Sequence, residues 1–304
     1  MRSAIVTGGR GFVGRYLVSR LRASGVSVTT IGRRQSAEAT HIVLEQWDSG
    51  EFARILEDIA PDCIFHLVGA ARGTPEELEH INVSLTRRLL QAVKSSDLRP
   101  VVVVAGSAAE YGSAIVEGEP VRETARCMPL SAYGATKYAQ TCQTLEFGAA
   151  TGNPVLVARI FNPIGAGMPR HLAIGDFAHQ IASIPGNRGT LRVGNIDVSR
   201  DMIDIEHVAA LLCRLAVNPH ARGVVNLCSG EAVSLRELVE MLIADSGREI
   251  DIEVDQARVR ANDFKSVIGS TDLLTKLGCR PPPTDFPAVI ARVWREMEEL
   301  MPSA

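Results

Sequence analysis

The chain has 304 residues, 46% of them hydrophobic, and a formal net charge of −3 at pH 7. This length provides enough apolar side chains for one large domain or two modest ones. Because basic and acidic residues are interspersed and nearly balanced, neither nucleic acid nor an anionic membrane is expected as a partner. No apolar run approaches the roughly 20 residues that span a membrane. The N-terminus shows no signal-peptide pattern, so a cytoplasmic protein is expected.

Six scattered cysteines form no C-x-x-C pair. Such scatter is typical of buried, reduced thiols, and it indicates neither a metal site nor a disulfide framework. No internal repeat or low-complexity segment interrupts the chain.

Residues 3–21 show the order strand, glycine turn, helix. Their glycines, Gly8, Gly11 and Gly14, have the spacing G-x-x-G-x-x-G. In a nucleotide-binding turn the first glycine permits the tight turn and the second removes the Cβ that would block a pyrophosphate. The third lets the helix pack closely on the strand. The helix begins at Phe12 and Val13, where free N–H groups and the positive end of the helix dipole favour phosphates. The stretch therefore predicts a dinucleotide-binding site.

The residues after the second predicted strand, 26–31, favour one dinucleotide over another. An acidic residue at this point would bind the ribose 2′-OH of NAD, but the first carboxylate is Glu38. Arg33 and Arg34 stand there instead, and Arg10 lies in the glycine turn. Guanidinium groups suit a 2′-phosphate, so NADP(H) is the preferred cofactor, with NAD(H) as the alternative. In the other interpretation, two of these arginines are simply solvated.

A third strand is expected at 41–44, and Asp48 follows it. This carboxylate could accept a hydrogen bond from an adenine amino group, or it could lie in an ordinary surface turn. A helix is expected at 52–59, before the next apolar run.

The run 62–68 is continuous and apolar, as is typical of a parallel strand buried on both faces. Leu67 lies near its end, and Gly69 and Ala70 are small enough for the backbone to come close to a cofactor. We therefore expect these three residues to line the cofactor site. His66, inside the strand, is interpreted as a core histidine with satisfied hydrogen bonds rather than a catalyst.

A long helix is expected from 75 to 95 with Asn82 in its interior, and four valines at 101–104 predict a buried central strand. Strands and helices that alternate at this rhythm indicate an α/β fold with a Rossmann-type, right-handed doubly wound parallel sheet. In such a sheet ligands bind beyond the carboxyl ends of the strands. Ser107 lies at one of these ends.

Tyr133 and Lys137 are four residues apart at the start of the next predicted helix, so they share one face. A lone Y-x-x-x-K is common by chance. It gains significance here because a nucleotide turn, a strand-end serine and this pair follow one another in the order that one catalytic mechanism requires.

Together these motifs resemble the extended short-chain dehydrogenase/reductase family, which includes nucleotide-sugar epimerases, dehydratases and reductases. The matching segments are TGGRGFVG (7–14), GSAAEYG (106–112), YGATK (133–137) and RIFNPIG (159–165). The resemblance implies that Tyr133 is the acid/base and that Lys137 is its electrostatic partner and a ligand of the nicotinamide ribose. It further implies that Ser107 is a second donor to the substrate oxygen, that Asn82 serves a proton relay and that Asn162 contacts the sugar or diphosphate.

Two later segments, 193–208 and 257–270, are similar to those of GDP-mannose 4,6-dehydratases and GDP-4-keto-6-deoxy-mannose reductases. This similarity implies that Arg200 contacts the nucleotide, Arg260 the diphosphate and Asp263 a ribose. The expected substrate is thus a nucleotide sugar that is GDP-linked. The expected reaction is the NADPH-dependent reduction of GDP-4-keto-6-deoxy-D-mannose to GDP-D-rhamnose.

Arginines in these two segments are also expected to clamp the diphosphate, because guanidinium forks pair phosphates bidentately. The candidates are Arg200, Arg258 and Arg260. For Arg258 a solvated surface position is the alternative. Lys265 and the Gly269–Ser270 pair depart from the family pattern, so a base other than guanine stays open.

One departure separates the reaction types of the family. In the 4,6-dehydratases a glutamate needed for water elimination stands two residues before the tyrosine of the YG pair, and here that position is Ala109. Glu110 comes one residue later, where strand or turn alternation aims it elsewhere. A reductase or a 4-epimerase needs no carboxylate there, so reduction is favoured, with epimerase and dehydratase as the alternatives. The non-enzyme alternative, an NADP-binding redox sensor, would need neither Tyr133 nor Lys137, and both are present.

The rise in glycine and proline in the stretch NPIGAGMPR marks a passage between two domains. Residues 1–160 are expected to form the NADP-binding domain, with returning segments near 190–230 that include a strand at 223–228. Residues 161–304 are expected to form a smaller α/β domain for the nucleotide sugar. By resemblance, a homodimer is expected through the helices around 76–95 and 133–150.

The expected chemistry is a ketone reduction. Hydride leaves the nicotinamide C4 while Tyr133 gives a proton to the carbonyl oxygen. Free tyrosine has a pKa of about 10, and we expect Lys137, one helical turn away, to lower that pKa together with the oxidised cofactor ring. Ser107 would steady the developing alkoxide.

Overall fold

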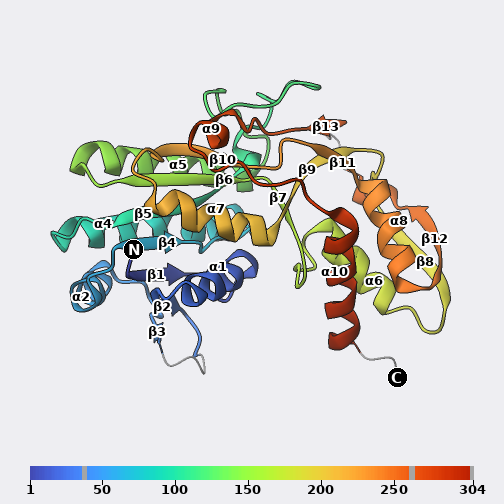
Figure 1. The fold of residues 1–304 in the computed structure, drawn as a ribbon, viewed down its shortest axis with the longest axis horizontal. Coiled ribbons are helices and arrows are strands. Elements are labelled where there is room, and N and C mark those ends of the chain that lie inside the picture. Colours follow the sequence, from blue (N-terminus) through green and yellow to red (C-terminus); the bar gives the residue numbers. More distant parts are fainter. Residues whose placement is uncertain (36–39, 260–263, 302–304) are drawn as a thin grey trace.

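The computed structural model describes residues 1–35, 40–259 and 264–301. Within these ranges its largest element is a sheet of seven parallel strands in the order β10-β6-β5-β4-β1-β2-β3 (Figure 1). The strands are β1 (Ser3–Thr7), β2 (Ser27–Gly32), β3 (His41–Val43), β4 (Cys63–His66), β5 (Val101–Ser107), β6 (Val155–Ile160) and β10 (Gly223–Leu227). Val102, Val103 and Val104 are fully buried in β5, as their apolar run predicts. The sheet confirms the predicted Rossmann-type α/β fold.

The strand order reverses between β1 and β4. Ligands of doubly wound sheets bind in the crevice beyond the carboxyl ends of the strands at such a switch point. Gly8 follows β1 and Leu67 follows β4, and the N–H of Leu67 donates to the carbonyl of Thr7 at 3.1 Å. Two segments predicted to line the cofactor site therefore lie side by side.

Strand β10 returns to this sheet from far along the chain. It pairs in parallel with β6, so that Val225 lies beside Ala158. This confirms the prediction that the strand at 223–228 returns toward the N-terminal half.

Two layers of helices cover the sheet. One face carries α1 (Phe12–Ala23) and α7 (Ile205–Val217), and the other carries α2 (Ser49–Ile59), α4 (Leu85–Ser95) and α5 (Ala132–Thr151) (Figure 1). Neighbouring residues of β1 point to opposite layers, because Val6 belongs to the apolar cluster of Leu17 whereas Ile5 belongs to that of Phe52. In the part of the chain described, no helix is both long and apolar enough to cross a membrane.

The helix predicted from 75 to 95 contains one wide turn. α3 (Pro75–Glu79) runs into a π-turn, η1 (His80–Ser84), and α4 follows. The hydroxyl of Thr86 donates to the carbonyl of Asn82 at 2.8 Å, so a side chain competes for this part of the helical ladder. The helix predicted from 75 to 95 is confirmed, and the π-turn inside it is a feature that the sequence did not show.

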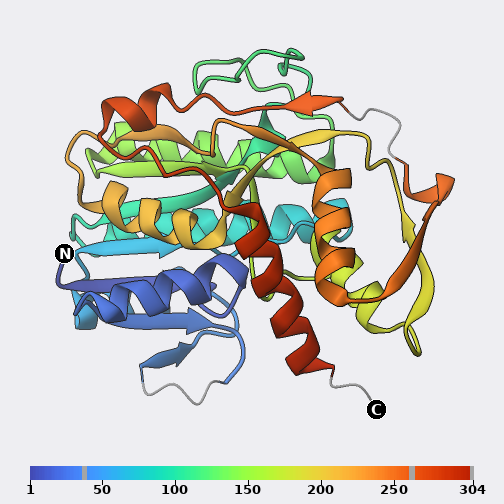
Figure 2. The ribbon, with the colours of Figure 1, turned by 45° about the vertical axis from the view of Figure 1, so that its right-hand side comes forward.

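The residues after β6 build a smaller body beside the sheet, with α10 lying along α8 (Figure 2). Its central strand, β9 (Ser199–Asp204), pairs with three short strands. Leu238 and Trp294 lie in its apolar core. Its other elements are β7 (Asn162–Ile164), α6 (Ala173–Ala182), β8 (Arg188–Val193), β11 (Ala232–Ser234), α8 (Leu235–Ser246), β12 (Glu249–Val254), η3 (Gln256–Arg258), β13 (Ser266–Val267) and α10 (Phe286–Leu300). The short helix α9 (Asp272–Lys276) packs against β10 of the large sheet instead.

Candidate active site

The glycine turn after β1 is packed too tightly for side chains. Gly8 has a φ of +70°, and a Cβ there would lie 2.9 Å from the backbone carbon of Leu67. A Cβ on Gly14 would lie 2.7 Å from the Cα of Gly9. Gly11 caps α1, and its N–H donates to the carbonyl of Gly8 at 2.9 Å. The first turn of α1, at Phe12, therefore opens directly onto the space in front of the glycines.

A cavity of about 670 Å³ lies in front of this turn. Its lining consists of Gly8, Gly9, Arg10, Gly11, Ile31, Gly32, Arg33, Arg34 and His41. The three arginines are exposed at its rim, and none of the described lining residues is a carboxylate. Arg10 also donates to the carbonyl of Gln35 at 2.9 Å, which ties the glycine turn to the segment after β2. The arrangement suits an anionic group.

His41 lines the same cavity, and the sequence reasoning missed it. Its ring nitrogens lie 2.8 Å from the Thr30 hydroxyl oxygen and 2.9 Å from the Arg34 carbonyl oxygen. Because a carbonyl only accepts, we infer that Nε2 of His41 carries a proton and donates to Arg34. His41 thus holds one of the two neighbouring arginines. The register of β3 against β2, which pairs Thr30 with His41, is the signal that would have revealed it.

Asn82 fastens the loop after β4 to α5. Its Oδ1 accepts from the N–H of Ala70 at 2.8 Å, and its Nδ2 donates to the carbonyl of Ala70 at 2.9 Å and to the hydroxyl of Thr136 at 2.9 Å. Gly69 lies beside these groups, since a Cβ there would be 3.3 Å from Oδ1 of Asn82 and 3.8 Å from Nζ of Lys137. The loop therefore approaches the Tyr133–Lys137 helix closely. The proton-relay role of Asn82 stays a prediction.

His66 and Asp48 have structural partners. His66 is fully buried, and its two ring nitrogens lie 2.8 Å and 3.0 Å from the hydroxyls of Thr7 and Thr86, as expected of a core histidine. Burial lowers its pKa to about 3, so the ring is neutral. Asp48 caps α2, where its Oδ1 accepts from two backbone N–H groups at 2.9 and 3.0 Å. That cap corresponds to the surface-turn alternative, and the adenine contact stays a prediction.

Lys137 is buried on the face of α5 that it shares with Tyr133. Its ammonium donates to the carbonyl of Ala105 and to Oε1 of Gln140. Burial lowers the pKa of Lys137 to about 8, and the charge of Glu110 opposes this effect. An ammonium has three N–H groups, so two hold the side chain in place and the third can serve a ligand.

The pKa of Tyr133 is raised above its ordinary value, mainly by burial. A hydrogen bond with Ser107 opposes the rise, and the negative charge of Glu110 adds to it. The ammonium of Lys137 is bound to Ala105 and Gln140, and the expected lowering of the Tyr133 pKa by Lys137 together with the oxidised cofactor ring stays a prediction. A phenol that stays protonated at neutral pH can act as a proton donor.

Ser107 ends β5 and begins a single 3-10 turn, η2 (Ala108–Glu110). Its hydroxyl oxygen accepts from the N–H of Ala109 at 3.2 Å, while its own N–H donates to Oε1 of Glu110 at 2.8 Å. Glu110 is fully buried, and its Oε2 accepts from Nε of Arg159 at 2.8 Å. The prediction that Glu110 is aimed away from the site is confirmed.

Two of the predicted substrate residues, Asn162 and Arg200, lie on the paired strands β7 and β9. Nδ2 of Asn162 donates to the carbonyl of Asp201 at 2.8 Å. Nη1 of Arg200 donates to the carbonyls of Ser199 and Phe264, both at 2.8 Å. Arg260 and Asp263 lie outside the described residues.

Arg258 does not stand free as a diphosphate clamp. Its guanidinium pairs with the carboxylates of Asp176 at 2.8 Å and Asp255 at 3.5 Å. Its side chain is 43% exposed, which fits the solvated surface alternative, and two carboxylates, from α6 and from the end of β12, pair with it there. Such pairing depends on tertiary contacts, which residue type alone does not reveal.

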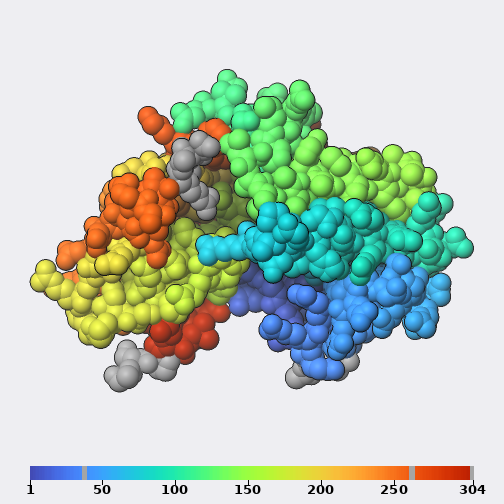
Figure 3. Space-filling model, turned by 180° about the vertical axis from the view of Figure 1, so that it is seen from behind, coloured from blue at the N-terminus to red at the C-terminus, as the bar shows by residue number. Residues whose placement is uncertain are grey.

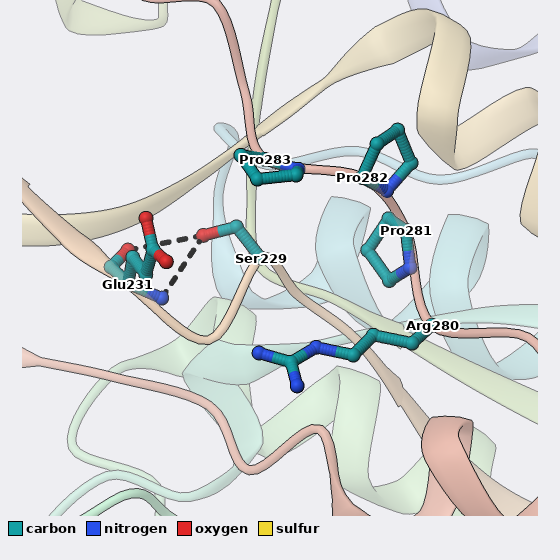
Figure 4. A pocket seen from close by; sticks show the side chains of 6 residues that line it. All are labelled: Ser229, Glu231, Arg280, Pro281, Pro282 and Pro283. Atoms are coloured by element: carbon teal, nitrogen blue, oxygen red, sulfur yellow. Dashed lines mark hydrogen bonds between the residues drawn. The ribbon is translucent and has the colours of Figure 1, made fainter.

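The surface is hollowed where the yellow and orange C-terminal elements meet the green and cyan ones (Figure 3). The two parts are also joined at the loop after β4, where Arg72 donates to the carbonyl of His171 at 3.1 Å. A second cavity of about 470 Å³ lies between the loop after β10 and a proline segment (Figure 4). Its lining residues are Ser229, Glu231, Arg280, Pro281, Pro282 and Pro283. None of them was predicted to take part in catalysis, so the candidate site is the glycine-turn crevice.

Comparison with known proteins agrees with this geometry. Residues 4–228 match the sequence model of the NAD dependent epimerase/dehydratase family. The chain belongs to this family. Within the family, it is 33% identical to GDP-6-deoxy-D-mannose reductase of Pseudomonas aeruginosa over 87% of both chains. It is 32% identical to dTDP-6-deoxy-L-talose 4-dehydrogenase (NAD(P)(+)) of Kitasatospora kifunensis, over 81% of this chain and 80% of that relative.

The solved structures of the NAD dependent epimerase/dehydratase family include a similar one with a bound cofactor. The structure of RMD from Pseudomonas aeruginosa complexed with NADPH has a TM-score of 0.84 to this chain at 29% identity. The match covers 99% of this chain and 100% of that one. The two proteins therefore share one architecture from end to end.

Proposed function

We propose that the protein reduces the C4 ketone of GDP-4-keto-6-deoxy-D-mannose with NADPH and forms GDP-D-rhamnose. One observation carries the choice of reaction: Ser107 and the Tyr133–Lys137 pair converge at the strand ends, while Glu110 is buried against Arg159. A hydroxyl, a phenol and an ammonium are sufficient for ketone reduction. Elimination of water would need a carboxylate at the position of Ala109. The name of the Pseudomonas aeruginosa relative supports the same substrate.

Bound NADPH would supply the hydride. Gly8 and Gly11 leave room for its diphosphate at the start of α1, and Arg33 and Arg34 would bind the 2′-phosphate. The exposed arginines among the described lining residues support NADP(H) over NAD(H).

Tyr133 would then give its proton to the substrate oxygen, while the Ser107 hydroxyl donates a hydrogen bond to the same oxygen. The support for this role is that the Ser107 hydroxyl interacts with Tyr133 and that its oxygen is held by the N–H of Ala109 at 3.2 Å. Loss of such a donor lowers rates on the order of 10²-fold. Lys137 would hold the nicotinamide ribose with its third N–H. Asn162 and Arg200, with Arg260 and Asp263, would bind the nucleotide sugar.

The decisive experiment follows NADPH absorbance in the presence of GDP-4-keto-6-deoxy-D-mannose, with the dTDP and UDP analogues as controls. We expect stoichiometric consumption of NADPH and a preference for the GDP sugar. A 4-epimerase would instead be purified with bound cofactor, would need none added and would consume none. Consumption with the dTDP sugar alone would contradict the proposed base.

The proposal includes a cytoplasmic homodimer formed through the helices around 76–95 and 133–150. It also includes a division into an NADP-binding unit, 1–160 with the returning segments near 190–230, and a nucleotide-sugar unit, 161–304. Light scattering of the purified protein tests the dimer, because a monomeric mass would contradict it. Limited proteolysis with and without NADPH tests the division, since a bound cofactor should protect the first unit selectively.

A further inference from the structure

One buried carboxylate joins three elements under the candidate active site. Oε1 of Glu110 accepts from the N–H of Ser107 at the end of β5, at 2.8 Å. Its Oε2 accepts from Thr141 on α5 and from Arg159 on β6, both at 2.8 Å. Glu110 is 0% exposed and Arg159 is 3% exposed. A strand end, the next strand and a helix are therefore fixed to one another by a single side chain.

This junction reaches the predicted proton donors. Thr141 lies four residues after Lys137, on the same face of α5. Ser107 is bound to Glu110 through its backbone and to Tyr133 through its side chain. Any shift of Glu110 would thus move Ser107 relative to the helix that carries Tyr133.

The fold retains an ion pair where an apolar pair would be easier to bury. The guanidinium of Arg159 lies 4.6 Å from the ring centroid of Tyr111, so the pair has no water on that side. Replacing a buried ion pair by apolar residues of similar volume is often neutral or stabilising. Folding stability therefore does not explain why this ion pair is present. Its position next to Ser107 suggests a role in the active site.

We propose that Glu110 is a positioning residue, which holds Ser107 in register with the Tyr133 helix so that both hydroxyls converge on one substrate oxygen. The inference rests on the proposed function and adds a residue that touches neither substrate nor cofactor. It acts through Ser107, by the 2.8 Å bond to its backbone.

The charge of Glu110 has a second effect on the same site. It raises the pKa of Tyr133 and opposes the effect of burial on the pKa of Lys137. Removing the charge should therefore move both values down and shift the alkaline limb of the activity profile to lower pH. Other ionisable groups around this junction include Arg159 on β6, with Tyr111, Cys127, Tyr138, Cys142 and Glu123 near it, and His66 on β4, which lies near Lys137.

Two double variants separate position from charge. In Glu110→Gln/Arg159→Met the amide oxygen can still accept from Ser107, although the ion pair is gone. In Glu110→Ala/Arg159→Met both the acceptor and the charge are gone. A matched control is Asp204→Asn/Arg292→Met, which removes a 2.6 Å ion pair between β9 and α10. Each variant is first compared with the wild type by circular dichroism and thermal unfolding.

We expect the alanine double variant to have a kcat at least about tenfold below that of the glutamine one, with a KM for NADPH within a few-fold. The glutamine variant should show the alkaline limb at lower pH. When Ser107→Ala is already present, the alanine double variant should lower kcat little further. The effects of two residues that act as one unit on kcat do not add. The control should keep the kcat and pH profile of the wild type.

Equal kcat for the two Glu110 variants, or full additivity with Ser107→Ala, would overturn the proposal. If the alanine variant does not fold, the glutamine variant decides by its alkaline limb, and an unshifted limb counts against the proposal. If no sugar is turned over, the proposed function fails by itself. An ultraviolet titration of the Tyr133 phenol, read as the difference from Tyr133→Phe, then tests Glu110 without any substrate: a downward shift in the glutamine variant supports the proposal, and an unchanged value overturns it.

Discussion

Asn82 binds both backbone groups of Ala70, accepting from its N–H at 2.8 Å and donating to its carbonyl at 2.9 Å. The loop after β4 is thereby held where the switch point of the sheet opens. We expect Asn82→Ala to weaken NADPH binding on the order of tenfold, about 1.4 kcal/mol, because the loop loses two hydrogen bonds. Fluorescence titration measures this. Ser84→Ala is the control from the same turn, since the Ser84 hydroxyl donates to the carboxylate of Glu79 and not to the loop.

Tyr133→Phe removes the proposed proton donor and keeps the ring. We expect turnover to fall on the order of 10²–10⁴-fold, while NADPH affinity stays within a few-fold. Tyr138→Phe on the same helix should leave turnover near that of the wild type. Wild-type rates in Tyr133→Phe would show that the phenol is not the acid.

The arginine pair after β2 should decide between the two cofactors. A charge-assisted hydrogen bond contributes about 1.5–3 kcal/mol, so Arg33→Ser/Arg34→Ser should raise the KM for NADPH on the order of 10- to 100-fold. The KM for NADH should change little, because that cofactor has no 2′-phosphate. Arg20→Ser, at the exposed end of α1, removes a similar charge elsewhere and should alter neither. An equal rise in the KM for NADPH and for NADH would indicate that the variant has a damaged fold.

Lys137 should make the folding stability depend on pH. Its pKa is about 8 in the folded protein against 10.5 for an ordinary lysine. Between these values the unfolded chain binds more protons than the folded one, so stability rises with pH across this window. The stability of the wild type relative to Lys137→Met should therefore increase from pH 8 to 10.5, as denaturant unfolding can measure. A difference that stays constant with pH would mean that the buried amine does not titrate there.

Most of the architecture could be predicted from patterns of residues that lie close together in the sequence. The valines of β5, the glycine turn and the i, i+4 pair of Tyr133 and Lys137 each depend on residues close in sequence. Their signals are periodicity and steric room, which a single sequence displays directly.

Long-range partners account for what the sequence did not show. Glu110 and Arg159 are 49 positions apart, and Asn82 is 12 positions from Ala70, the loop residue that its side chain binds. The pKa of Tyr133 rises because of burial, which follows from packing and not from its neighbours in the helix. His41 was overlooked because its importance lies in a register between two strands.

The pairing of β10 with β6 has a consequence for synthesis and engineering. A nascent chain that has just completed β6 exposes a row of unpaired N–H and C=O groups, which can template aggregation. The free edge of β6 stays unpaired until residues 223–227 have left the ribosome. The first strands of the smaller body are synthesised before that point. A cut behind residue 160 would make that exposure permanent, so a cofactor-binding fragment for engineering should carry β10 by a short linker.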